Sequence, residues 1–102
     1  MFRYIYHGQV FPRQFREFFE AYEKFEKKLR EKEYAPSQPF SPVLGVVNEV
    51  SIVIDYESLE QFQKENDAFS ADAEIMSLYR EMGTHFDGYP HDEIWQSATQ
   101  IA

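Results

Sequence analysis

The chain has 102 residues, of which 43% are hydrophobic and 27% charged, with a net charge of −8 and no cysteine. This length allows one domain, assigned to residues 1–102, and the lack of cysteine excludes disulfides and cysteine nucleophiles. Ten Phe, seven Tyr and one Trp make an intrinsically disordered chain untenable. No segment approaches the roughly 20 apolar residues of a membrane span, and residues 1–7 lack the apolar region of a signal peptide. We therefore expect no membrane partner and a cytoplasmic location.

Charge is unevenly distributed along the chain. Residues 1–48 hold eight Lys/Arg and six Asp/Glu, whereas residues 49–102 hold two Lys/Arg and twelve Asp/Glu. A chain this acidic repels phosphate backbones, and its basic residues alternate with glutamates, so we expect no nucleic-acid partner. The acidity either serves solubility or lets the acidic second half pair with the more basic first half, within or between chains.

The first half predicts a strand followed by a long helix. Residues 2–10 alternate, with Phe2, Tyr4 and Tyr6 on one face and Arg3, Ile5 and His7 on the other. Residues 11–33 then carry aromatic and aliphatic side chains at the spacing of one helix face, and Pro12 fits the first turn.

Prolines at 36, 39 and 42 predict a loop over residues 34–42, because proline bars both a helix and a central strand. A short strand is predicted over 43–47, and Asn48-Glu49 can turn the chain into the clearest strand, residues 50–56. The alternative is one long bent strand over 43–56 with Asn48 at a bulge.

Ser58 and Gln61 form a predicted capping box that opens a helix, kink and helix over residues 59–82. Ser70 is the predicted start of the second part, and Gly83 is the predicted residue after its end. A loop over 84–92 and a last strand over 93–98 complete the pattern.

The order βαββαβ predicts an α+β, ferredoxin-like fold: a four-stranded antiparallel sheet with both helices on one face. We place the first and third strands at its centre and expect these two to run parallel. The other face would carry Ile5, Val53 and Trp95, and an exposed apolar sheet face needs cover. A second copy of the chain is the simplest cover, so we expect a homodimer.

Several segments resemble the dimeric α/β-barrel superfamily, and NIPSNAP-type domains most of all. Leu44-Gly45 is similar to the family's glycine-bearing strand, residues 48–59 to the strand and helix that follow it, and Glu93-Ile94-Trp95 to the short final strand. NIPSNAP domains carry an Asp-Pro-x-Trp-like kink where this sequence has Phe69-Ser70-Ala71-Asp72. The resemblance implies a dimeric α/β barrel and, as in many relatives, an apolar pocket between sheet and helices.

His7 and Asp55 are the first candidate for chemistry. Both are predicted on the face away from the helices, near the same ends of two adjacent parallel strands. A carboxylate that orients an imidazole makes it a general base. A plain ion pair at an interface is the alternative.

Tyrosines form the second candidate site, because buried hydroxyls need partners and could hydrogen-bond a planar or phenolic ligand. The predicted ligand-binding residues are Tyr4, Tyr6, Tyr22, Tyr56, Tyr79 and Trp95. The alternative is an aromatic core that is simply full.

The third candidate is the run His85-Phe86-Asp87 with His91-Asp92. These are metal-ligand types at a spacing that matches no signature, so we predict no metal and keep His85 or His91 as a catalytic candidate at a pocket mouth. No phosphate loop or dinucleotide fingerprint is present, so we expect no cofactor.

Two interpretations remain open at this point. One is a small dimeric protein that binds or transforms a small, partly apolar molecule without a cofactor, as a cyclase, isomerase or monooxygenase would. In it His7 transfers the proton, Asp55 orients His7, and tyrosines hold a carbonyl or phenol. The other is a non-catalytic dimeric interaction module with a filled aromatic core. An enzyme needs a cavity with a titratable group inside it, and an interaction module does not.

Overall fold

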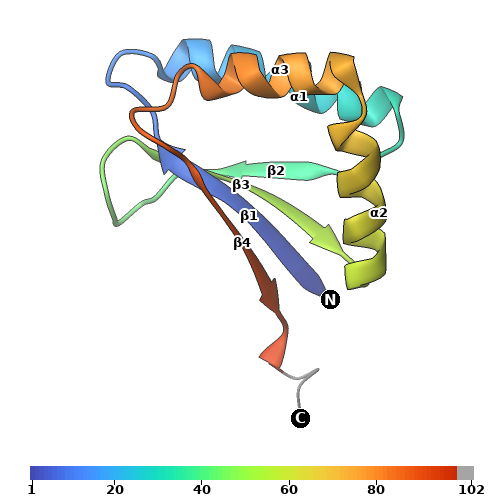
Figure 1. Cartoon of the computed structure of the whole chain (residues 1–102). Coiled ribbons are helices and arrows are strands. Elements are labelled where there is room, and N and C mark those ends of the chain that lie inside the picture. Colours follow the sequence, from blue (N-terminus) through green and yellow to red (C-terminus); the bar gives the residue numbers. More distant parts are fainter. Residues whose placement is uncertain (99–102) are drawn as a thin grey trace.

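The computed structural model describes residues 1–98 and lays one sheet beneath three helices (Figure 1). The elements in chain order are β1 (Phe2–Gln9), α1 (Phe15–Glu31), β2 (Ser37–Phe40), β3 (Glu49–Tyr56), α2 (Leu59–Ser70), α3 (Ala73–Gly83) and β4 (His91–Gln96). Helices α1 and α3 lie side by side across the sheet, and α2 descends beside it toward the end of β3 (Figure 1). The predicted ferredoxin-like α+β fold is therefore confirmed. None of the helices in residues 1–98 has the length and apolar character needed to cross a membrane.

The strands lie in the order β2-β3-β1-β4, and every neighbouring pair is antiparallel. The expected central position of β1 and β3 is confirmed, but the expected parallel pairing is wrong. Phe2 lies opposite Tyr56 and Gln9 opposite Glu49, so the two strands run in opposite directions. The reason is the order in which the chain connects the strands. Helix α1 crosses over from β1 to β2, so these two strands run in the same direction. Because β3 pairs antiparallel with β2, it also runs antiparallel to β1.

Strand alternation separates a helix-covered face from an open face, as predicted. The helix-covered face carries Tyr6 and, opposite it, Ile52, both buried. Residues directly opposite each other in antiparallel strands share a face. The open face therefore combines β1, β3, β4 and β2 residues: Arg3, Ile5, His7, Ser51, Val53, Asp55, His91, Glu93, Trp95, Gln38 and Phe40.

Helix α1 begins four residues later than predicted. Arg13 has φ = 77°, a left-handed conformation that a helix interior does not accommodate, so the helix starts at Phe15 and ends at Glu31. The predicted apolar stripe is confirmed in its middle, where the buried positions are Phe18, Ala21, Tyr22, Phe25 and Leu29.

The second strand was predicted in the wrong place. It occupies Ser37–Phe40, inside the predicted loop, while residues 43–47 form an exposed irregular segment instead of a strand. β2 is an edge strand, where a proline such as Pro39 is tolerated because its missing N–H faces away from the ladder. Asn48, with φ = 71°, turns the chain just before β3, so the alternative of one long bent strand is also wrong.

The predicted helix, kink and helix is confirmed, with different capping residues. Ser58 Oγ accepts the Gln61 amide at 3.1 Å, but the Gln61 side chain accepts from the Glu57 amide, so the capping box is only half formed. Asp72, not Ser70, caps α3, and Ser70 is the last residue of α2. Gly83 is the last residue of α3 and not the residue after it. The final strand begins at His91, two residues before the predicted start, and ends at Gln96.

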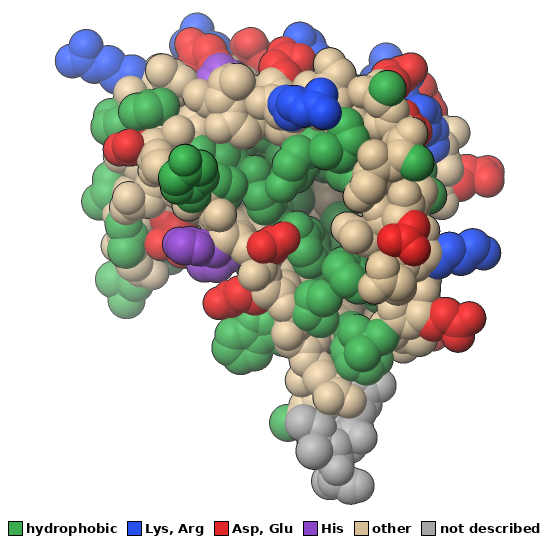
Figure 2. Space-filling model, viewed as in Figure 1, with side chains coloured by type: hydrophobic (Ala, Val, Ile, Leu, Met, Phe, Trp, Pro, Cys, Tyr) green, Lys and Arg blue, Asp and Glu red, His purple; other side chains and the backbone are tan. Residues whose placement is uncertain are grey.

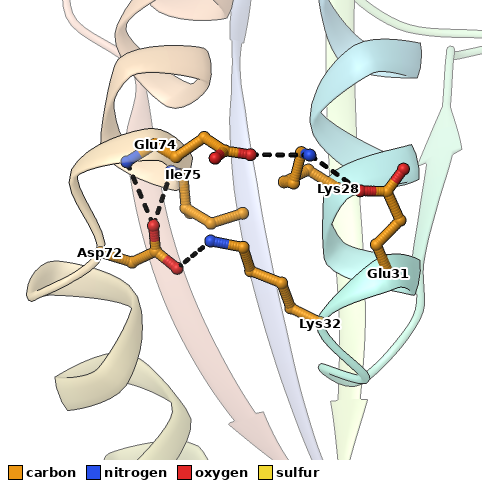
Figure 3. Close-up of polar contacts among 6 residues, drawn as sticks. All are labelled: Lys28, Glu31, Lys32, Asp72, Glu74 and Ile75. Carbon is orange, nitrogen blue, oxygen red and sulfur yellow. Dashed lines mark hydrogen bonds and ion pairs between the residues drawn. The ribbon is translucent and has the colours of Figure 1, made fainter.

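Ion pairs between the two halves of the chain hold α3 against α1 (Figure 3). Lys28 Nζ lies 2.7 Å from a Glu74 oxygen and 2.8 Å from a Glu31 oxygen, and Lys32 Nζ lies 2.6 Å from Asp72 Oδ2. Asp72 Oδ1 also accepts the backbone amides of Glu74 and Ile75 at 3.1 Å each. The predicted pairing of the acidic half with the basic half is therefore present within one chain.

The core places an aromatic ring directly against a glycine of β1. A Cβ built on Gly8 would lie 2.8 Å from a ring carbon of Phe86 and 3.2 Å from the Cα of Pro90. Phe86 is itself buried against Phe18 and Tyr6, with ring centroids 5.3 and 5.5 Å away. The close packing of this end of the core therefore depends on the missing side chain at position 8.

We expect Gly8→Ala to destabilise the protein by about 1–3 kcal/mol, because the extra methyl group must displace a packed ring. Gly83→Ala is the matched control: its Cβ would meet only the Tyr6 hydroxyl, at 3.9 Å, and alanine favours a helix. Urea unfolding measures both. Equal free energies of unfolding for the two variants would contradict this account of the packing.

Candidate functional site

A cavity of about 190 Å³ lies between the helix-covered face of the sheet and the three helices. Figure 2 shows the hollow, with hydrophobic side chains along its walls. The sheet and the segment before β2 contribute Tyr4, Tyr6, Tyr34, Ala35, Ile52, Ile54, Tyr56 and Asp92. The helices contribute Phe25, Leu29, Phe62, Glu65, Asn66, Phe69, Ser70, Met76, Tyr79 and Met82.

Aromatic rings from every layer make contact around this cavity. Phe62 of α2 contacts both Tyr4 and Tyr56, with centroids 5.8 and 5.4 Å away. Tyr79 of α3 contacts Tyr6 at 5.2 Å and Phe69 at 6.1 Å. Rings at these separations support one another beyond the area that they bury. The wall is therefore built from contacts between sheet and helices, and the space inside it is what those contacts leave open.

Four of the tyrosine hydroxyls in the wall have a pKa raised by burial, which keeps them protonated. Burial raises the pKa of Tyr4 and of Tyr6, and the nearby Tyr79 raises both further. Burial raises the pKa of Tyr56 to about 12, and it also raises the pKa of Tyr79. At neutral pH each is a neutral hydroxyl that can donate a hydrogen bond. No residue among 1–98 hydrogen-bonds the Tyr56 hydroxyl, so this donor is available to a ligand.

Two carboxylates complete the polar lining. The Tyr4 hydroxyl donates to Asp92 Oδ2 at 3.3 Å, and Asp92 lies opposite Tyr6 on β4, on the helix-covered face. Glu65 of α2 accepts the Ala35 amide at 2.8 Å and the Gln61 side-chain amide at 3.1 Å. Glu65 therefore joins α2 to the segment before β2, while Asp92 accepts a single hydrogen bond from the described part of the chain.

The predicted His7–Asp55 pair is wrong as a contact. The antiparallel register sets Arg3 opposite Asp55 and His7 opposite Ser51, so the two predicted partners lie toward opposite ends of their strands. Asp55 accepts from the Arg3 guanidinium at 2.8 and 3.1 Å, and this hydrogen-bonded ion pair lowers the pKa of the Asp55 carboxyl. His7 Nε2 lies 3.6 Å from a Glu93 oxygen. Both residues lie on the open face, away from the cavity.

The loop candidates are also separated. His85 hydrogen-bonds Gln14 through Nδ1 at 2.9 Å and is not part of the cavity wall. His91 and Asp92 are consecutive residues of β4 and therefore project from opposite faces of the sheet. Within residues 1–98, no group of three or more His, Asp or Glu could hold a metal ion.

Most of the predicted tyrosines line the cavity, whereas none of the predicted catalytic residues does. Tyr4, Tyr6, Tyr56 and Tyr79 line the cavity, as the alternation of β1 and β3 indicates. Tyr22 instead hydrogen-bonds Ser37 Oγ at 2.8 Å and joins α1 to β2. Trp95 lies on the open face, where its indole N–H donates to Glu93 at 3.2 Å.

Sequence reasoning missed the polar residues that face the cavity from α2, and it named Asp92 of β4 only as a metal-ligand type. Glu65 and Asn66 lie between Phe62 and Phe69, within one helix stripe, and this spacing could have marked them. Asp92 falls within the predicted loop, because the strand that carries it begins two residues before the predicted strand.

No family model and no curated protein matches this sequence. Solved structures do match its fold. A NIPSNAP domain protein from Burkholderia xenovorans superposes with a TM-score of 0.79 at 14% identity, covering 96% of this chain and 95% of that one. The chain has the fold of NIPSNAP domains.

The same fold occurs in other solved structures. A NIPSNAP family protein of unknown function from Agrobacterium tumefaciens has a TM-score of 0.78 at 15% identity, covering 96% of this chain and 88% of that one. An antibiotic biosynthesis monooxygenase has a TM-score of 0.74 at 11% identity, covering 96% and 99%. At such identities the likeness extends to the fold, and the NIPSNAP-like fold drawn from the sequence is confirmed.

We expect the buried tyrosines to stay protonated above pH 10 and to ionise only when the protein unfolds at higher pH. A tyrosine whose pKa is raised in the folded state contributes stability below its unfolded value of about 10, and this contribution is lost as pH rises toward the folded value. Phenolate absorbance and circular dichroism, followed together from pH 9 upward, should show a delayed group of tyrosines that ionises as the fold is lost. Ionisation of all seven tyrosines near pH 10 in a folded protein would contradict the burial described here.

Proposed function

We propose that this protein binds a small, partly apolar molecule in the cavity between the sheet and its helices. The observation that carries the proposal is the unfilled space of about 190 Å³ within a wall of aromatic rings. An apolar protein cavity of about 150 Å³ is large enough to bind benzene, so this space suits a molecule with a single substituted ring. Convergent polar groups in a mostly apolar cavity are typical of ligand sites.

The wall supplies hydrogen-bond donors to such a molecule. The Tyr56 hydroxyl, with its raised pKa and no partner in the described chain, suits a carbonyl or phenol oxygen of the ligand. The Tyr4 hydroxyl and Asp92 form a second polar point on the β4 side.

We extend the proposal to conversion of the bound molecule without a bound cofactor, by a cyclase-, isomerase- or monooxygenase-like reaction. The shared fold with an antibiotic biosynthesis monooxygenase supports this extension. In the proposal, Asp92 and the wall tyrosines take the place of His7, Asp55 and His85, because those three lie outside the cavity lining. A carboxylate beside a neutral phenol can accept a proton and return it during such a reaction.

Blocking the cavity tests the binding proposal. Asn66 is an exposed residue of α2 that borders the cavity, so Asn66→Trp should fill the space without disturbing the core. Gln63→Trp adds the same side chain to the same helix outside the lining and is the matched control. Acetophenone, titrated against each protein and followed by amide chemical shifts, should perturb cavity residues in the wild type and in Gln63→Trp but not in Asn66→Trp. Equal responses from both variants, or no response from the wild type, would refute the proposal.

The hydroxyl of Tyr56 gives a sharper second test. Tyr56→Phe removes one donor and retains the ring contact with Phe62. We expect acetophenone affinity to fall about fivefold, the loss of about one hydrogen bond, with little change in the free energy of unfolding. Unchanged affinity would show that this hydroxyl does not bind the carbonyl.

We also propose that the open face of the sheet is covered by a second copy of the chain. Phe40 and Trp95 are exposed apolar residues there, and Ile5 and Val53 lie between them. The alternative function, a non-catalytic interaction module, keeps this interface but leaves the cavity without a ligand. The acetophenone titration distinguishes these two functions.

Sedimentation tests the dimer. The wild type should sediment at twice the chain mass of 12.2 kDa, and Trp95→Asp should shift it toward the monomer because it buries an unpaired charge in the interface. Tyr89→Asp changes an exposed aromatic residue outside the sheet and should leave the dimer intact. A wild type that stays monomeric at micromolar concentration would remove the dimer proposal.

A further inference from the structure

The wall of the cavity combines aromatic faces and carboxylates with no basic residue. The lining includes the carboxylates of Glu65 and Asp92, and it includes no Lys, Arg or His among residues 1–98. Arg80, the basic residue of α3, is exposed and lies outside the lining.

The aromatic faces favour positive charge for a reason of their own. The face of a phenol or phenyl ring carries partial negative charge, and a cation within about 6 Å of the ring centre is attracted to it, more strongly where water is excluded. Tyr4, Phe62 and Tyr56 form one continuous aromatic contact along the wall. Phe69 and Tyr79 form a second contact on the helix side.

The two carboxylates differ in how far they are already engaged. Both oxygens of Glu65 accept hydrogen bonds, from Ala35 and Gln61. Asp92 accepts one hydrogen bond, through Oδ2 from Tyr4, and no ion pair joins it to a basic side chain of residues 1–98. Asp92 is therefore the carboxylate with capacity to pair with a charged ligand group.

We propose that the cavity takes an organic cation: an ammonium group attached to an apolar or aromatic body, with the ammonium beside Asp92 and the body between the aromatic rings. This inference rests on the proposed function, since it names the class of ligand for the same cavity. An anion of the same shape would meet carboxylates and ring faces and find no positive charge in the wall.

Three molecules of similar size separate charge from shape. We choose 2-phenylethylamine, 2-phenylethanol and phenylacetate, which are cationic, neutral and anionic at pH 7, and titrate each into the full chain by calorimetry at low ionic strength. The amine should bind about tenfold more tightly than the alcohol. Phenylacetate should bind more weakly than both. Added salt should weaken the binding of the amine and leave the binding of the alcohol unchanged.

The variant Asp92→Asn tests whether the Asp92 carboxylate binds the ammonium group. It should reduce the affinity for the amine several-fold and leave only the preference that the aromatic faces supply, while the affinity for the alcohol should not change. Asp87→Asn removes an exposed carboxylate outside the lining and should leave both affinities unaltered. An equal loss in both variants would mean that net charge alone attracts the amine, and would overturn the assignment to Asp92.

The outcomes separate this inference from the proposed function. If the alcohol or phenylacetate binds as tightly as the amine, the cation inference fails while small-molecule binding in the cavity stands. If none of the three binds and acetophenone also fails, both are wrong. If acetophenone alone binds, the cavity selects a neutral carbonyl, and the cation inference again fails.

Discussion

One carboxylate, Asp72, joins the ends of the three helices that wall the cavity. It stands between α2 and α3, accepts two amides at the start of α3 and lies 2.6 Å from Lys32, which follows α1 (Figure 3). The hydrogen bond from Lys32 lowers the pKa of this carboxyl, so it remains charged at neutral pH. The three helices thus meet at one corner, and α3 lies along α1 while α2 turns toward the sheet and leaves space between them.

The strands that face the core could be predicted from sequence, and the edge strand could not. In β1 and β3, burial on one face imposes a clear alternation on the residues, and the sequence shows it. β2 is four residues long and includes Pro39, so its pairing with β3 depends on contacts from elsewhere, such as the hydrogen bond between Ser37 and Tyr22. The apolar residues 43–47 have a strand-like composition but lie exposed, because no strand in the described part of the chain pairs with them.

The sequence predicted the tyrosines of the candidate site but not the charged residues that lie beside them. Four tyrosines reach the cavity because strand and helix periodicity place them on the inner face. The His7–Asp55 contact required β1 and β3 to run parallel, whereas the predicted βαββαβ order itself makes them antiparallel and sets Arg3 opposite Asp55. The place of Asp92 on the cavity side could not be predicted, because it lies near the start of an edge strand whose residues are all exposed, so no apolar alternation marks where that strand begins. The order and direction of the strands therefore determine which charged side chains reach the cavity.

The most direct test of the account is a crystal structure of the purified protein, examined for the space between the sheet and helices α2 and α3. The account predicts an open cavity of about 190 Å³, bounded by Tyr4, Tyr56 and Tyr79 and holding density for a small molecule or ordered water. Aromatic side chains that close together and fill this space would contradict it, and the open face of the sheet would then be the surface through which the protein acts.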